Sequence, residues 1–124
     1  MYLIQNSIFY QIKQNLYLPE MGGILGININ DRHTVTDFYF DSIGTTEKNC
    51  YTPDVETLNR VIAKWAENGI EFIGFVHSHP NSIHLSRHDI EYANKIMRAC
   101  NMPEIIMMIY IPETQELHQY VLHI

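Results

Sequence analysis

Four histidines fall within twelve residues of this sequence, and two of them are separated by a single serine. The segment His77-Ser78-His79-Pro80 directly follows the apolar run 70–76, which is typical of a short β-strand. Side chains at positions i and i+2 of a strand point to the same face. Two imidazoles presented together in this way can bind one metal ion. At the end of a strand they would lie at the rim of a sheet, within reach of a substrate.

A third ligand is expected from Asp89. Ser86 and Asp89 have the S-x-x-D spacing of a capping box ahead of an apolar helical pattern. The positive end of the helix dipole favours the ionised form of a carboxylate at that position, so capping and metal binding are compatible. While its oxygen caps the helix, the Ser86 hydroxyl can still donate its own proton. Two histidines and one carboxylate form a common open zinc site, with water as the fourth ligand.

Hydrolysis at such a site also needs a proton acceptor. Zinc lowers the pKa of a bound water to about 7, and a nearby carboxylate can carry the proton on to a leaving amine. We expect Glu20, at the start of the glycine-rich run 21–29, to be this general acid/base.

Hydrophobic periodicity and turn residues predict a chain of alternating helices and strands. Ser7 is predicted to cap the first helix, and Thr52-Pro53 to open the second. The region 44–52 is predicted to be a loop. The expected elements are a helix at 7–16, strands at 21–29 and 34–42, a helix from 53 to 68, a strand at 70–76, a helix from 86 to about 101, and strands at 105–111 and 117–124.

This order predicts one α/β (α+β) domain spanning residues 1–124, with helices packed against a mixed sheet. The formal net charge of −6 and the scattered lysines and arginines argue against a nucleic acid partner. No segment is apolar enough to span a membrane and no signal peptide is evident, so we expect a cytoplasmic protein. Cys50 and Cys100 are expected to be free, partly buried thiols.

Taken together, these motifs resemble the JAMM metalloproteases, the zinc-binding members of the MPN-domain superfamily. The family signature is an upstream glutamate, then H-x-H, then S-x-x-D. Glu20 leading into the glycine-rich strand is similar to the first motif. The segment Ile73-Gly74-Phe75-Val76 before His77-Ser78-His79-Pro80 is also typical. The resemblance covers most of the chain, and the small prokaryotic members are the most similar in length.

The resemblance implies a curved mixed β-sheet sandwiched by helices, as in cytidine deaminase-like proteins. It implies one catalytic zinc ion held by His77, His79 and Asp89, with Glu20 as general acid/base and Ser86 stabilising the oxyanion. Family members hydrolyse peptide or isopeptide bonds, often after the C-terminal tail of ubiquitin or a ubiquitin-like protein. The expected partner is therefore a protein or peptide substrate. The oligomeric state is left open.

The sequence departs from the family pattern at one place. Only six residues separate His79 from Ser86, where the family usually has seven. A loop can absorb this difference, but whether His84 or His88 takes part in the site is left open. The chain also has no room for the long insertions with which larger members grip ubiquitin chains.

Three other functions are alternatives to a zinc isopeptidase. The first is a non-catalytic MPN-like scaffold, and the second is a hydrolase of cell-wall or phage-tail peptides. The third is a metal-dependent phosphoesterase of the PHP type, which also uses an H-x-H pair. That class places the pair near the N-terminus of a barrel much longer than 124 residues.

Overall fold

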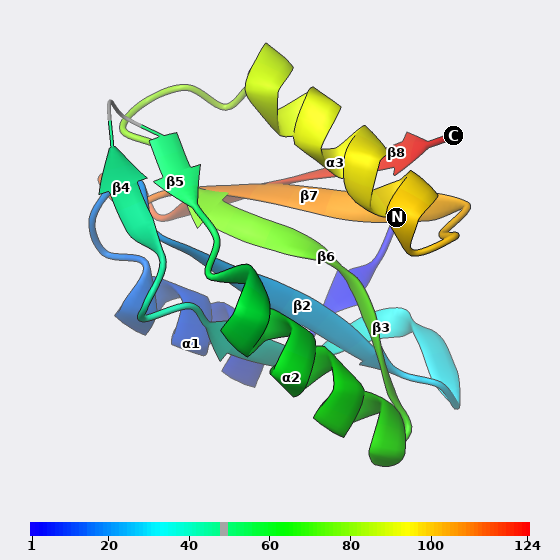
Figure 1. Ribbon diagram of the computed structural model, residues 1–124. Coiled ribbons are helices and arrows are strands. Elements are labelled where there is room, and N and C mark those ends of the chain that lie inside the picture. Colours follow the sequence, from blue (N-terminus) through cyan, green and yellow to red (C-terminus); the bar gives the residue numbers. More distant parts are fainter. Residues whose placement is uncertain (48–49) are drawn as a thin grey trace.

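The computed structural model describes the backbone of residues 1–47 and 50–124, and the side chains of residues 1–44 and 51–124. Its elements, in chain order, are β1 (Leu3–Ile4), α1 (Asn6–Asn15), β2 (Gly22–Asn28), β3 (Asp31–Phe40), β4 (Thr45–Glu47), β5 (Cys50–Thr52), α2 (Val55–Glu67), β6 (Ile70–Ser78), α3 (Arg87–Ala99), β7 (Glu104–Ile111) and β8 (Glu116–His123). A curled six-stranded sheet in the order β1-β3-β2-β6-β7-β8 forms the centre of the molecule (Figure 1).

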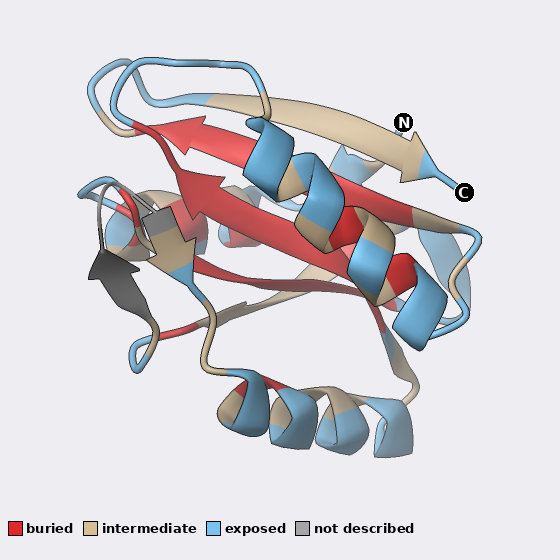
Figure 2. Ribbon diagram, turned by 45° about the horizontal axis from the view of Figure 1, so that its top comes forward, coloured by how far each residue is buried: buried red, intermediate tan, exposed pale blue. Residues whose placement is uncertain are grey.

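Strand direction within the sheet is mixed. β2 pairs antiparallel with both β3 and β6, β6 pairs parallel with β7, and β7 pairs antiparallel with β8. The parallel β6–β7 pair needs a crossover, and α3 supplies it. The three central strands are buried along most of their length, whereas the helices keep an exposed outer side (Figure 2).

Helices cover both faces of the sheet, so the sheet has an apolar core on each side. On one face, α1 packs Ile8 and Ile12 against β2, β6 and β7. On the other face, α2 contributes Leu58, and α3 contributes Ala93 and Met97. This α+β arrangement, a sheet between two helical layers, confirms the predicted fold class.

Five predictions about local structure are wrong or incomplete. β1 was not predicted, and the expected loop at 44–52 contains the antiparallel strands β4 and β5, with residues 48–49 outside the described backbone. Ser7 does not cap α1; the N-cap is Gln5, because the chain turns into the helix directly after β1. Thr52 is paired with Thr45 in the hairpin, so α2 begins later, at Val55 after Asp54. The strand predicted to end at 76 continues to Ser78.

Cys100 is a free thiol and is exposed rather than partly buried. It lies at the C-terminal end of α3, where that helix meets solvent. The side chain of Cys50 falls outside the described residues. Among the described helices, none is long and apolar enough to cross a lipid bilayer.

Candidate metal centre

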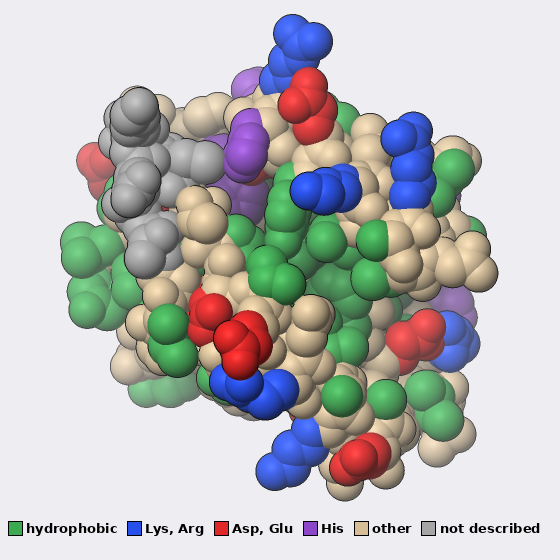
Figure 3. Space-filling view, viewed as in Figure 1, with side chains coloured by type: hydrophobic (Ala, Val, Ile, Leu, Met, Phe, Trp, Pro, Cys, Tyr) green, Lys and Arg blue, Asp and Glu red, His purple; other side chains and the backbone are tan. Residues whose placement is uncertain are grey.

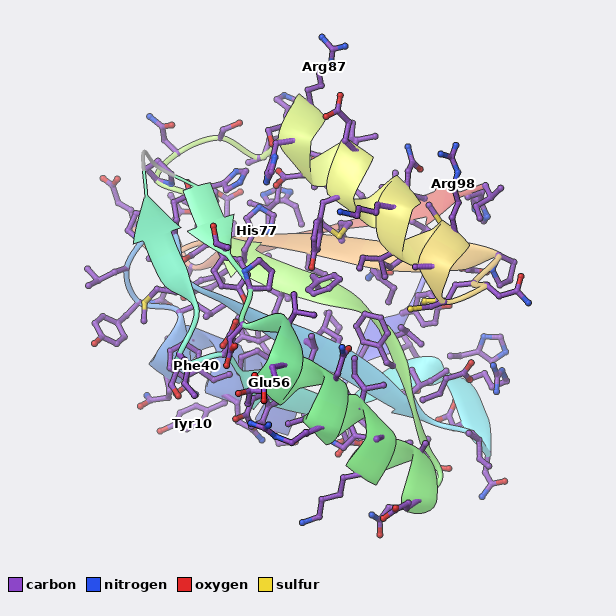
Figure 4. All side chains as sticks on the ribbon, in the orientation of Figure 1. Tyr10, Phe40, Glu56, His77, Arg87 and Arg98 are labelled. Atoms are coloured by element: carbon purple, nitrogen blue, oxygen red, sulfur yellow. The ribbon has the colours of Figure 1, made fainter. Side chains whose placement is uncertain are left out.

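The end of β6 holds the two histidines of the H-x-H motif. His77 lies between Gly22 of β2 and Ile109 of β7, and the His79 backbone N–H donates to the carbonyl of Tyr110 at 3.0 Å. The two Nε2 atoms are 2.7 Å apart, and both side chains are buried. Figure 4 labels His77 at this strand end, between the β4–β5 hairpin and the start of α3. The same-face arrangement of the two imidazoles is therefore observed.

A β-bulge decides which face of the sheet these histidines occupy. Leu25 pairs with Gly74 and Gly26 pairs with Phe72, so Ile73 is an extra residue in β6. One extra residue reverses the alternation of side chains that follows it. Phe72 and Phe75 consequently both join the core under α2 and α3, whereas strict alternation would have separated them. By alternation from Phe75, His77 and His79 lie on the same face of β6 as Phe75. This is the face that α3, which carries Asp89, covers.

Asp89 approaches the two imidazoles from the first turn of α3. Its Oδ2 lies 3.4 Å from Nε2 of His77 and 3.7 Å from Nε2 of His79. The predicted capping box is also present. The Asp89 N–H donates to Ser86 Oγ at 3.0 Å, and the Ser86 N–H donates to Asp89 Oδ2 at 2.8 Å. These two hydrogen bonds hold the carboxylate in place, so capping and convergence coexist as the sequence suggested.

Glu20 reaches the same point from the segment before β2. Its side chain is 8% exposed, which excludes an ordinary solvated surface glutamate. One carboxylate oxygen of Glu20 and one ring nitrogen each of His77 and His79 all lie within 4.8 Å of one another. Four ionisable groups from three separate segments thus face one small volume.

The electrostatic environment distinguishes the two carboxyl groups. Burial raises the pKa of Glu20, and the neighbouring Asp89 charge raises it further, against an opposing effect of His77. Burial would also raise the pKa of Asp89, but the hydrogen bond and charge of His77, together with the hydrogen bond from the Ser86 N–H, hold it well below its usual range. Asp89 is therefore a persistent anion, and Glu20 is the better proton acceptor.

Burial and the neighbouring His77 lower the pKa of His79. A lower pKa favours the neutral imidazole, which is the form that binds a metal. The Nδ1 atom of His79 is 3.1 Å from the carbonyl oxygen of Ser82. With Nδ1–H donating to this carbonyl, Nε2 keeps its lone pair for a metal, as is usual for metal-binding histidines.

The two imidazole nitrogens of His77 and His79 and the carboxylate of Asp89 fit a divalent metal such as zinc. Zinc–nitrogen and zinc–oxygen distances of about 2.0–2.1 Å place two tetrahedral ligands about 3.4 Å apart. The separations of 3.4 and 3.7 Å from Asp89 to the two imidazoles match that value. The 2.7 Å between the two Nε2 atoms is shorter, so the rings must separate by about 0.7 Å to admit the ion, using the spacing above.

The centre opens into a cavity of about 490 Å³. Ser86 lines this cavity, and so do His84 and His88. Both of these histidines are exposed, and the one possible metal-ligand cluster among the described residues contains neither. The 80–85 loop leads from the end of β6 to α3, and the Tyr120 hydroxyl donates to the carbonyl of Ile83 in that loop.

Sequence reasoning missed three residues that support the site. Ser78 is fully buried; its Oγ donates to the Leu18 carbonyl at 2.5 Å and accepts from the Met21 N–H at 2.9 Å, which fastens the segment carrying Glu20. Alternation within the H-x-H motif could have indicated this, because Ser78 must point to the face opposite the histidines.

Asp41 and Tyr51 form the other missed support. The buried Asp41 carboxylate accepts hydrogen bonds from the Tyr51 hydroxyl at 2.6 Å and from the Asp54 N–H at 2.9 Å. The Tyr51 ring lies against Gly22, where an added Cβ would come within 2.4 Å of it. These contacts attach Tyr51, which lines the cavity, to the sheet. No local pattern in the sequence indicates them.

Residues 5–123 match the family model described as prokaryotic homologs of the JAB domain. Among solved structures, the chain is similar to the solution structure of protein DSY2949 from Desulfitobacterium hafniense. The TM-score is 0.66 at 18% identity, over 98% of this chain and 82% of that one, and this likeness concerns the fold. A search of curated proteins finds no match.

The family match spans nearly the whole chain and contains both the glycine-rich strand and the H-x-H and S-x-x-D motifs. The chain belongs to the family of prokaryotic homologs of the JAB domain, within the JAB/MPN superfamily.

Proposed function

We propose that this protein is a zinc-dependent hydrolase of amide bonds, a peptidase or isopeptidase. The observation that carries the proposal is the convergence of His77, His79 and Asp89, with interatomic distances of 2.7, 3.4 and 3.7 Å, beside the buried Glu20. An open site with two histidines and a carboxylate is a common arrangement for hydrolytic zinc. Membership of the JAB/MPN superfamily supports the same activity.

In this proposal His77, His79 and Asp89 hold the metal. Their donor types and spacing suit zinc, and Asp89 is assigned as the anionic ligand because its pKa is held low. Zinc bound there would supply Lewis acidity, which polarises the substrate carbonyl and makes water acidic near neutral pH.

Glu20 is the proposed general acid/base. A carboxyl group with a raised pKa is closer to the operating pH, which makes it better at both taking up and releasing a proton. It would take the proton of the attacking water and deliver it to the nitrogen of the leaving amine. Ser86 keeps a hydroxyl proton while its Oγ caps α3, and it is the proposed donor to the developing oxyanion.

The proposed substrate is a protein or peptide, with the C-terminal tail of a ubiquitin-like protein as one form of it. The scattered basic residues offer no track for a nucleic acid. We propose the cytoplasm as the site of action, because the exposed Cys100 is a free thiol of the kind that a reducing compartment preserves.

The test combines metal analysis with hydrolysis by the variant Glu20→Gln. The wild type and the variant should both retain about one zinc per chain, and the variant should lose about 100-fold or more of kcat on any peptide that the wild type cleaves. The control Glu113→Gln, an exposed glutamate on the β7–β8 turn, should change neither property. Hydrolysis that survives Glu20→Gln would refute the acid/base assignment. Stoichiometric zinc without cleavage of any peptide or fusion substrate would favour the non-catalytic scaffold.

A further inference from the structure

The cavity at the metal centre is much larger than the metal chemistry requires. A zinc ion with its water fills little more than the volume of one or two water molecules, each about 30 Å³. The cavity measures about 490 Å³, within the range of about 300–1,000 Å³ usual for sites that bind whole ligands. Most of the cavity can therefore hold a part of the substrate other than the scissile amide.

Most of the surface of the remaining space is apolar. Phe75 and Met107 lie side by side on neighbouring strands and form its floor, and both are buried. Leu85, which precedes α3, and Tyr92 of α3 also line it. The Tyr92 and Phe75 rings meet edge to face, with centroids 5.5 Å apart, so wall and floor are in contact.

The opposite wall also presents carbon atoms. Pro53 and Tyr51 both line the cavity, and the Tyr51 hydroxyl donates to Asp41. Figure 3 shows histidine side chains near the start of α3, with an apolar surface extending from them between α3 and α2. A side chain that enters from the metal would meet apolar groups on three sides.

Charge argues against a charged substrate side chain in this space. No lysine or arginine is among the residues that line the cavity. The carboxylates of Glu20 and Asp89 together balance the two positive charges of a zinc ion. Neither carboxylate is therefore left to pair with a cationic side chain, and burying an unpaired charge is costly.

We infer that the space between Phe75, Met107, Leu85 and Tyr92 is a specificity pocket for a bulky apolar side chain next to the scissile amide. The inference rests on the proposed zinc site and adds the class of substrate: polypeptides with a leucine-sized or aromatic residue beside the cleaved bond. A glycine at that position would leave the apolar surface uncovered. Each methylene that such a pocket buries is worth about tenfold or more in discrimination.

Three hydroxamic acids test the inference by binding, independently of catalysis. Acetohydroxamic acid, isocaprohydroxamic acid and the hydroxamate of δ-aminovaleric acid share a zinc-binding head and differ in bearing a small, a branched apolar or a cationic tail. Dissociation constants are measured by titration calorimetry on the zinc-loaded protein, after its zinc content has been determined. We expect the branched apolar compound to bind about tenfold or more tightly than either of the others.

The variant Leu85→Ala should reduce that preference severalfold and leave the zinc content unchanged. Ile90→Ala, which removes an exposed aliphatic side chain in the nearby first turn of α3 but outside the cavity, is the matched control and should keep the preference. Equal affinities for the three compounds, or tightest binding of the cationic one, would overturn the pocket but not the zinc site. A wild-type protein that binds no zinc would overturn the proposed function and the pocket together.

Discussion

Ser78 offers the sharpest test of how the site is held together. Ser78 stands between the two histidines in the sequence, but its side chain points to the opposite face of the strand. There it is fully buried and forms hydrogen bonds with Leu18 and Met21. The substitution Ser78→Ala removes the acceptor of the Met21 N–H and the donor to the Leu18 carbonyl. It leaves the pairing of His77 with β2 and β7 intact.

The expected cost follows from these two lost partners. A buried polar group left without a partner costs about 1–3 kcal/mol, and the lower half of that range applies because both of these hydrogen bonds are only partly buried. The free energy of unfolding should therefore fall by about 2–4 kcal/mol. With about 2.1 cal/mol/K per residue over 124 residues, the entropy of unfolding is about 0.26 kcal/mol/K, so Tm should fall by about 8–15 °C.

The effect on function should be selective. Glu20 lies within the segment that Ser78 fastens, and misplacing a catalytic group by about 1 Å costs about 100-fold in rate. We expect kcat to fall by about 10- to 100-fold below the melting range while one zinc per chain is retained. Calorimetry, metal analysis and peptide hydrolysis measure the three quantities.

The control is Ser7→Ala. Ser7 is exposed in the first turn of α1 and does not cap it, so alanine there should be neutral or slightly stabilising. A Ser78→Ala protein that melts within about 2 °C of the wild type would refute the hydrogen-bond reasoning. Loss of zinc in parallel with activity would instead show that Ser78 supports the metal ligands themselves.

Two further predictions concern the sheet and the buried glutamate. Gly74→Ala should lower the free energy of unfolding by about 3 kcal/mol or more, because the new Cβ would lie 1.9 Å from the Ile106 carbonyl oxygen. A variant whose midpoint of chemical denaturation is close to that of the wild type would contradict this prediction. In metal-free protein, burial raises the pKa of the Glu20 carboxyl group in the folded state. The contribution of this group to the free energy of unfolding is therefore complete below its ordinary pKa of 4.5. That contribution is lost as the pH rises through the higher pKa of the folded state. Metal-free Glu20→Gln should therefore gain stability over the wild type as the pH rises from about 4 to 7, and parallel urea-denaturation profiles across that range would exclude the effect.

Much of the candidate site could be predicted from the sequence because its signals lie within single elements. The i, i+2 spacing of His77 and His79 becomes a shared face in any strand. The S-x-x-D pattern becomes a capping box wherever a helix begins, which places Asp89 in the first turn of α3. For the same reason the amphipathic helices and the glycine-rich strand were predicted with approximately correct bounds.

Other features depend on segments that are far apart in the chain. The two short pairings, β1 with β3 and β4 with β5, leave little hydrophobic periodicity in the sequence. The predicted starts of α1 and α2, which follow these strands, are therefore the ones that differ from the structure. The bond of Asp41 to Tyr51 and the contact of Tyr51 with Gly22 exist only once the hairpin has folded over the sheet.

The sequence by itself determined the ligand types, their spacing and the elements that carry them. The tertiary structure alone decided that they meet. One extra residue, Ile73, in the pairing of β6 with β2 turns both histidines toward the side that α3 covers. A register of strand pairing is a relation between two chain segments, and the free energy that selects it comes from burying apolar side chains on both faces of the sheet at once.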